Sequence, residues 1–129
     1  MPRRQQKKPP PTPAPGDDPL GMPALIAAHV EWLRTRNYSE VTVRDRIRHL
    51  ESFAAWCADR GLTRPSEVTR PILERYQRSL FHYRKQSGGP LSFQSQHDRL
   101  SSVRSFFKYL TRSNVLPSNP AADLELPRI

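Results

Sequence analysis

Apolar residues at helical spacing constrain this chain more than any other feature of its sequence. Between residues 39 and 61, apolar side chains recur every three or four residues, which places them on one side of an α-helix. They are Val43, Ile47, Leu50, Ala54 and Cys57. At 100° per residue this stripe is about 80° wide, so one face of the helix is apolar and the other is free for polar residues. Ser39 is placed to cap the start of this helix, and Gly61 to end it.

The same spacing predicts a helix before this one and two helices after it. The first is expected to end near Asn37, the third to start at Thr69 and end at Gly88-Gly89-Pro90, and the fourth to start at Ser92. The inner faces are predicted to be Ile26, Val30 and Leu33 in the first; Ile72, Tyr76, Leu80 and either Tyr83 or Phe81 in the third; and Phe93, Gln96, Leu100, Val103, Phe107 and Leu110 in the fourth.

Prolines mark the two ends of the folded part. Eight of the 14 prolines fall within the first 23 residues, where their fixed φ and missing N–H favour extended, solvated backbone. We therefore expect residues 1–21 to form a disordered basic tail and residues 22–125 to form one domain. Near the other end, Asn119-Pro120 signals a short fifth helix that runs to Leu124. No segment alternates as a strand would, so the predicted class is all-α, with four main helices and a short fifth.

The sequence predicts no catalytic residues, no metal ligands and no cofactor. None of the four histidines lies three or four residues from another histidine or from the cysteine, which is the spacing of a local metal site. They are His29, His49, His82 and His97. The single cysteine, Cys57, lies on an apolar stripe and is interpreted as a small buried hydrophobe; it excludes an internal disulfide and fits a reducing compartment. No apolar run approaches the roughly 20 residues that a membrane helix needs.

Positive charge is the feature that points to a partner. Lysine and arginine number 21 against 12 acidic residues, a formal charge of +9, and such a chain attracts phosphate. On the predicted fourth helix, polar and basic side chains cluster away from the apolar stripe, with small serines between them that allow close approach to a backbone. They are Gln94, Ser101, Ser105, Lys108 and Arg112, with His97 and Arg104 at the border. On the second helix, Arg44 and Arg48 lie one turn apart.

Three segments resemble the core-binding domain of the tyrosine recombinase (phage integrase) family. The first is Ser39-Glu40-Val41-Thr42 followed by Leu50, Phe53 and Trp56; the second is Leu91-Ser92 followed by the run from Arg99 to Leu110; the third is Asn119-Pro120-Ala121 followed by Leu124-Glu125-Leu126-Pro127. They occur in the family's order and together span residues 24–128.

The resemblance implies a four-helix SAM-like orthogonal bundle that clamps one face of duplex DNA at a recombination site. It implies that strand exchange is carried out by a catalytic domain not in this chain, with residues 126–129 as the start of the linker to it. The chain alone is then not an enzyme. The implied partners are duplex DNA and other recombinase subunits in a synaptic complex, with no membrane and no small-molecule substrate. The implied location is the bacterial cytoplasm, at the nucleoid.

Carried over position by position, the resemblance assigns DNA contacts to two helices. The assigned residues are Thr42, Arg44 and Arg48 on the second helix, and Gln94, Ser95, His97, Arg99, Arg104 and Lys108 on the fourth. The chain departs from the family at Arg46, where tyrosine is frequent, at Asp98, where a basic residue is frequent, and at Phe93, where proline is frequent. The alternative hypothesis is a helical protein-interaction module that uses an apolar groove and the proline-rich tail.

Overall fold

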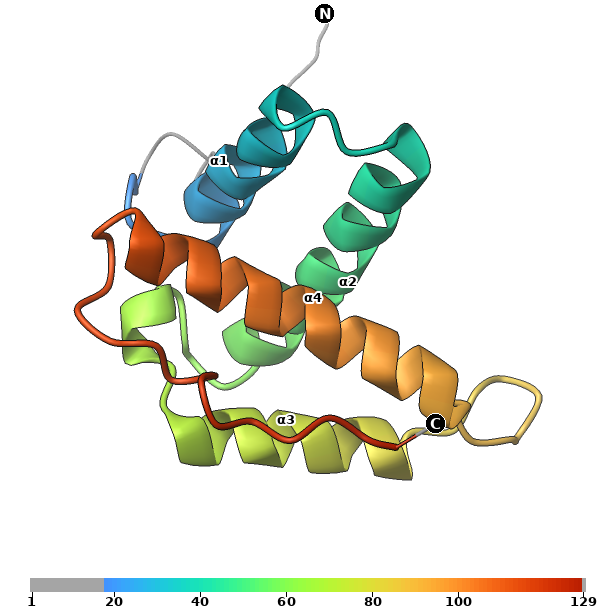
Figure 1. The fold of residues 1–129 in the computed structure, drawn as a ribbon. Helices are drawn as coiled ribbons and strands as arrows, with labels where there is room; N and C mark the ends of the chain where they lie inside the picture. Colours follow the sequence, from blue (N-terminus) through green and yellow to red (C-terminus); the bar gives the residue numbers. More distant parts are fainter. Residues whose placement is uncertain (1–17, 129) are drawn as a thin grey trace, which may run out of the picture.

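The computed structural model describes residues 18–128, which form four α-helices joined by loops (Figure 1). Helix α1 spans Met22–Thr35, α2 Glu40–Ala58, α3 Arg70–His82 and α4 Phe93–Arg112, and a 3-10 turn, η2, spans Pro65–Glu67. Residues 18–128 contain no strand, and their one isolated bridge joins Arg84 to Pro90. The predicted all-α class is therefore confirmed. None of the described helices is long and apolar enough to cross a membrane.

Helix α4 is the central element of the fold, because it packs against each of the other three helices. In Figure 1, α1 and α2 form a helical hairpin, α4 crosses that hairpin, and α3 lies below α4. The segment after α4 returns along α3, where the side-chain amide of Gln77 donates a hydrogen bond to the carbonyl of Glu125 at 2.9 Å. The packing of α4 on the other helices therefore determines which side of α2 and which side of α4 remain exposed to solvent.

Hydroxyl caps start three of the helices at the residues that the sequence predicts. The side-chain oxygens of Ser39, Thr69 and Ser92 accept hydrogen bonds from the backbone N–H three residues further on, at 3.1, 3.5 and 3.0 Å. Each cap satisfies a donor that the first helical turn leaves unpaired. The predicted starts of α2, α3 and α4 are confirmed.

Three helices end in the same way, with one residue in the left-handed region. These residues are Asn37, Gly61 and Asn114, with φ of 64°, 76° and 63°. After each of them, the next backbone N–H donates back to the carbonyl five residues earlier, as from Leu62 to Cys57 at 2.9 Å. This is the Schellman arrangement, which pairs carbonyls that the last turn leaves free. The predicted role of Gly61 is confirmed.

An aromatic cluster fills the core between α2 and α4. Phe53, Phe106 and Phe107 are fully buried, and the ring of Phe107 meets the other two edge to face or tilted, with centroids 6.1 and 5.5 Å apart. The predicted stripes contain only Phe107, so Phe53 and Phe106 widen the apolar faces beyond the sequence estimate. Cys57 is buried as predicted, and burial raises its pKa to about 12, so its thiol stays protonated.

The end of α3 and the burial of Phe93, the first residue of α4, differ from the prediction. Helix α3 ends at His82, well before the glycines, and Phe81, Tyr83 and Phe93 are about half exposed instead of facing inward. The reason is a tight loop over residues 83–92, in which Lys85 N–H donates to the Gly89 carbonyl at 2.8 Å. The glycines serve this turn and do not cap the helix. The buried face of α3 starts at Leu73, one position after the predicted Ile72, which is half-buried.

The predicted short fifth helix forms turns instead. Two i to i+3 backbone bonds, Ala122 to Asn119 and Leu124 to Ala121, close the turns without a helical bond between them. The side chain of Asn119 accepts from the backbone N–H of Ala121 at 2.9 Å, which is the capping role expected of it. No i to i+4 backbone bond forms among residues 119–124, so this segment stops at the turn stage.

Of the predicted N-terminal tail, residues 1–17 lie outside the described part of the chain, and residues 18–21 make specific contacts. The carboxylate of Asp18 accepts two hydrogen bonds from the guanidinium of Arg64, both at 3.0 Å. The backbone N–H of Met22 then donates to the carbonyl of Thr63 at 2.9 Å. Within the described residues, specific contacts thus extend back to Asp18.

Candidate nucleic-acid interface

A hydrogen bond ties the polar sides of α2 and α4 together. His49 Nδ1 lies 2.8 Å from the hydroxyl of Ser102, which also donates to the carbonyl of Asp98 at 3.1 Å. Burial lowers the pKa of His49, and the positive charges of Arg48 and Arg99 lower it further. The ring is therefore neutral at neutral pH, and its hydrogen bond to Ser102 links α2 to α4.

The three predicted contact residues of α2 differ in their surroundings. Thr42 is half-buried, and its hydroxyl accepts a hydrogen bond from the hydroxyl of Ser39 at 3.0 Å, so it takes part in the helix cap. Arg44 and Arg48 are exposed, and Arg48 pairs with Asp45 at 3.2 Å. At 100° per residue, positions 44 and 48 point about 160° away from Arg46, which faces α4. The two predicted arginines thus project from the side of α2 away from α4.

Four of the six predicted residues of α4 share one face. Gln94, His97, Arg104 and Lys108 fall within about 80° of each other at 100° per residue, whereas Ser95 and Arg99 point to the other side. At the start of this face, the carboxylate of Asp98 accepts from the Gln94 amide at 2.9 Å and lies 3.6 Å from His97 Nδ1. The acidic residue that departs from the family pattern therefore already engages one of the predicted contacts, Gln94.

Arg104 and Lys108 lie one turn apart on α4 but face different neighbours. The guanidinium of Arg104 donates to the carbonyl of Leu124 at 3.3 Å, which directs it toward the returning C-terminal segment. Lys108 is exposed, and within residues 18–128 no carboxylate lies within ion-pair distance of its amino group. Of the predicted cations on α4, Lys108 is the one that is directed toward open solvent beside α2.

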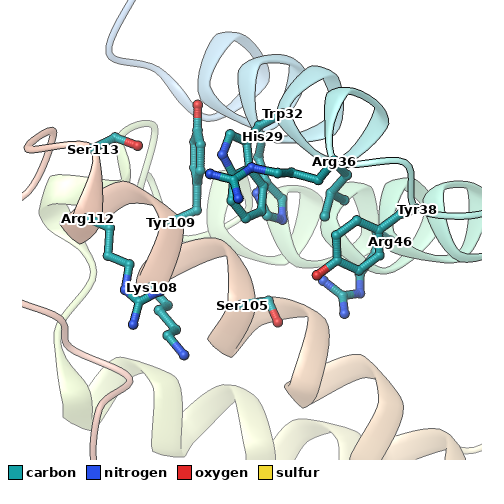
Figure 2. A pocket seen from close by; sticks show the side chains of 11 residues that line it. His29, Trp32, Arg36, Tyr38, Arg46, Ser105, Lys108, Tyr109, Arg112 and Ser113 are labelled. Carbon is teal, nitrogen blue, oxygen red and sulfur yellow. The ribbon is translucent and has the colours of Figure 1, made fainter.

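Packing adds two arginines, Arg36 and Arg46, to the basic face of α4 on which the sequence already places Lys108 and Arg112. Arg36, Arg46 and Arg112 line an open pocket of about 420 Å³ together with Lys108 (Figure 2). They come from the end of α1, from α2 and from α4. Spacing along α4 signals Arg112 next to Lys108, but no local pattern can signal Arg36 or Arg46, because they reach the pocket only when three helices pack. We call these four side chains with the hollow between them the basic pocket.

The described residues offer this surface positive charge and hydrogen-bond donors. Residues 18–128 contain no group of three histidine, cysteine or acidic side chains that could hold a metal ion. Among the tyrosines, Tyr76 is buried, which raises its pKa to about 12, and Tyr38 and Tyr83 are exposed. Unpaired guanidinium and ammonium groups on a helix face bind anionic oxygens, and those of phosphate above all.

Comparison with protein families gives one match that covers most of the chain. The family described as "Phage integrase, N-terminal SAM-like domain" matches residues 26–114. The chain is 45% identical over 115 residues to tyrosine recombinase XerC 2 of Ralstonia nicotianae, a match that covers 87% of the chain and 33% of that protein. It is 31% identical over 104 residues to tyrosine recombinase XerC of Oceanobacillus iheyensis, covering 80% of the chain and 32% of that protein. The chain thus spans about a third of the length of these relatives.

A solved structure has the same fold. It is the crystal structure of the N-terminal domain of a phage integrase/site-specific recombinase from Haloarcula marismortui. The TM-score is 0.71 at 17% sequence identity, and the match covers 84% of this chain and 97% of that domain. At this identity the similarity establishes the arrangement of the helices.

Proposed function

Because the chain belongs to the phage integrase N-terminal SAM-like domain family, we propose that it binds duplex DNA, clamping one face of the duplex at a recombination site. The family and fold that its motifs resemble are confirmed, and the chain is an N-terminal domain of the integrase type. The activity of the whole protein is part of the proposal: strand exchange by a tyrosine recombinase, with other recombinase subunits as partners in a synaptic complex on the bacterial nucleoid.

The observation that carries this proposal is the unpaired positive charge where α2 and α4 meet. Arg46 and Lys108 lie on the two helices beside the same hollow, and neither has a carboxylate within ion-pair distance in residues 18–128. Ser105 lies between them in Figure 2 and leaves room for a close approach. Such a surface recognises a phosphate backbone, which accounts for most of the affinity of proteins for DNA.

The proposal is tested by the salt dependence of binding to a fluorescent duplex. The dissociation constant, measured by anisotropy, should rise with salt so that log K falls by about 0.9 for each phosphate neutralised per tenfold increase in salt. Lys108→Gln should make this slope about one unit shallower and weaken binding to all sequences alike. The matched control is Arg75→Gln on α3, an exposed arginine that makes no ion pair within residues 18–128. Equal effects of the two substitutions would mean that the charge acts diffusely and that this face is not the interface.

The alternative function, a helical protein-interaction module, has its best candidate surface at the other end of α4. There a hollow is lined by Phe81 and Phe93, which are 52% and 55% exposed. The two functions differ in the same titration. A protein-interaction module has no reason to bind duplex DNA in a salt-dependent way, so an absence of binding at low salt would favour it.

A further inference from the structure

The basic pocket gathers positive charge from three helices, and no acidic side chain of residues 18–128 lies in its lining. Within the same residues, none of its four cations makes an ion pair. The guanidinium carbon of Arg36 lies 5.0 Å above the ring of Trp32, which holds that charge over the pocket (Figure 2). Like charges around one hollow repel each other, so an anion placed among them gains from all four at once.

The inner wall of the pocket carries a second unpaired polar group, the ring of His29. This ring is fully buried, and neither of its nitrogens has a hydrogen-bond partner. It is enclosed by the rings of Trp32, Phe106 and Tyr109, with centroids 6.0, 5.7 and 5.0 Å away. A buried polar group without a partner is costly, and such groups mark places where a ligand or an ordered water completes the bonding.

The donors around the pocket are of the kinds that bind the oxygens of a tetrahedral anion. Three guanidinium groups and one ammonium supply charge-assisted bonds, and the hydroxyls of Ser105 and Ser113 supply neutral ones. Ser105 and Lys108 also belong to the open face of α4, so the pocket is continuous with the proposed DNA surface.

We propose that the basic pocket binds a single phosphate group, which in the complex with DNA is one phosphate of the backbone. The inference rests on the proposed function for the source of the phosphate, but not for the chemistry of the pocket. One phosphate shared by α1, α2 and α4 would fix the orientation of the whole bundle on the duplex, because side chains from three helices would then contact the same point of the DNA backbone.

Phosphate in the pocket would change the protonation of His29. In the free chain, burial and then the positive charge of Arg46 lower its pKa to about 4. The other charges that face the ring through the pocket are Arg36 from the end of α1 and Lys108 and Arg112 from α4, all positive. An anion offsets these charges and raises the pKa of His29, so anion binding is coupled to uptake of a proton by the ring. The affinity for the anion therefore increases as the pH falls toward the pKa of His29 in the free chain.

The first test counts phosphates with a pair of substitutions. If Arg46 and Arg112 hold the same phosphate, the double variant Arg46→Gln/Arg112→Gln makes the salt slope of duplex binding shallower by about 0.9, one phosphate's share, and not by about 1.8. The control is Arg75→Gln/Arg78→Gln, an exposed pair on α3 that makes no ion pair in the described part of the chain, and it should leave the slope unchanged. Circular dichroism checks that each variant is folded. A loss of about 1.8, or of nothing, would overturn the single-phosphate pocket while leaving DNA binding in place.

The second test uses inorganic phosphate alone and follows the His29 ring protons by NMR. Phosphate should raise the pKa of His29 in the full chain and in the Arg75→Gln/Arg78→Gln control, but not in Arg46→Gln/Arg112→Gln. This shift without duplex binding would support the pocket, with free phosphate as its ligand, and would reject the proposed function. An unchanged His29 titration in the full chain would overturn the pocket.

Discussion

At the scale of single residues, the ring that couples charge to stability is His29, buried between α1 and α4. Its pKa falls from 6.5 to about 4 on folding, mainly because burial disfavours the charged ring. Between these values the unfolded chain binds a proton that the folded chain does not, so acid favours unfolding. Lowering the pH from 7 to 5 should therefore remove about 2 kcal/mol of the free energy of unfolding through this ring alone.

Urea denaturation at the two pH values, with His29→Phe as the comparison, measures this contribution. The substitution keeps a flat ring in aromatic surroundings and removes the titrating group. The variant should lose distinctly less stability than the original chain between pH 7 and 5. Equal losses would assign the acid sensitivity to other groups.

Arg104 and Lys108 provide a second prediction at this scale, because local spacing makes them look equivalent. The guanidinium of Arg104 is directed to the carbonyl of Leu124, whereas Lys108 faces the basic pocket. Lys108→Ala should make the salt slope of DNA binding shallower by about one unit, and Arg104→Ala by less than half of that. Anisotropy titrations of both variants check the order. The reverse order would place the DNA on the side of α4 that faces the C-terminal segment.

At the scale of the element, three helices stop at a left-handed residue, and at two of these sites the residue is asparagine. Asn37 and Asn114 have φ of 64° and 63°, a region in which a side chain with Cβ costs roughly 1–2 kcal/mol and asparagine somewhat less. Asn37→Ala and Asn114→Ala should each lower the free energy of unfolding by about 1 kcal/mol, while the glycine substitutions should not. Thermal melts of the four variants test this, and alanine variants as stable as the glycine ones would refute it.

The sequence is most informative where an element depends on its own neighbours. The caps at Ser39 and Ser92 and the stop at Gly61 are local hydrogen-bonding events, and all three are confirmed. The end of α3 was predicted wrongly because the glycine pair has two possible uses, as a helix stop and as a loop turn, and the closed loop over 83–92 decides between them. Phe93 was predicted wrongly because its side chain lines an open hollow beside the end of α3, although its position continues the apolar spacing of α4.

At the scale of the whole molecule, the candidate site depends on contacts between helices that spacing within one helix cannot predict. Spacing within one helix places Lys108 and Arg112 on a common face, as the fold does. The basic pocket needs Arg36 and Arg46 as well, and these come into place only through the packing of α1 and α2 on α4. The sequence identifies Arg46 only as a departure from the family pattern and does not predict that its side chain lines the basic pocket.

Packing also shows that the edge of the domain includes Asp18. A hydrogen bond from Arg64 lowers the pKa of this carboxylate, so the pair stabilises the fold above that pKa and is lost as acid protonates it. Deleting residues 1–21 should therefore keep the helical circular dichroism but melt at a lower temperature than deleting residues 1–17. Asp18→Asn should reproduce the difference at neutral pH. Asp59→Asn should not, because Asp59 is an exposed carboxylate that makes no ion pair among residues 18–128. Identical melting temperatures of the two deletions would show that the pair contributes nothing.

The sole thiol of the chain, Cys57, is buried and protonated inside the core that α2 shares with its neighbours. A thiol reagent such as a disulfide dye can reach it only during moments when α2 lifts from the bundle, and the reagent then marks that molecule permanently. The rate of colour development thus measures how often the native state opens around Cys57, and no engineered label is needed. A slower labelling rate of Cys57 in the presence of DNA would show that bound DNA keeps the helices packed together.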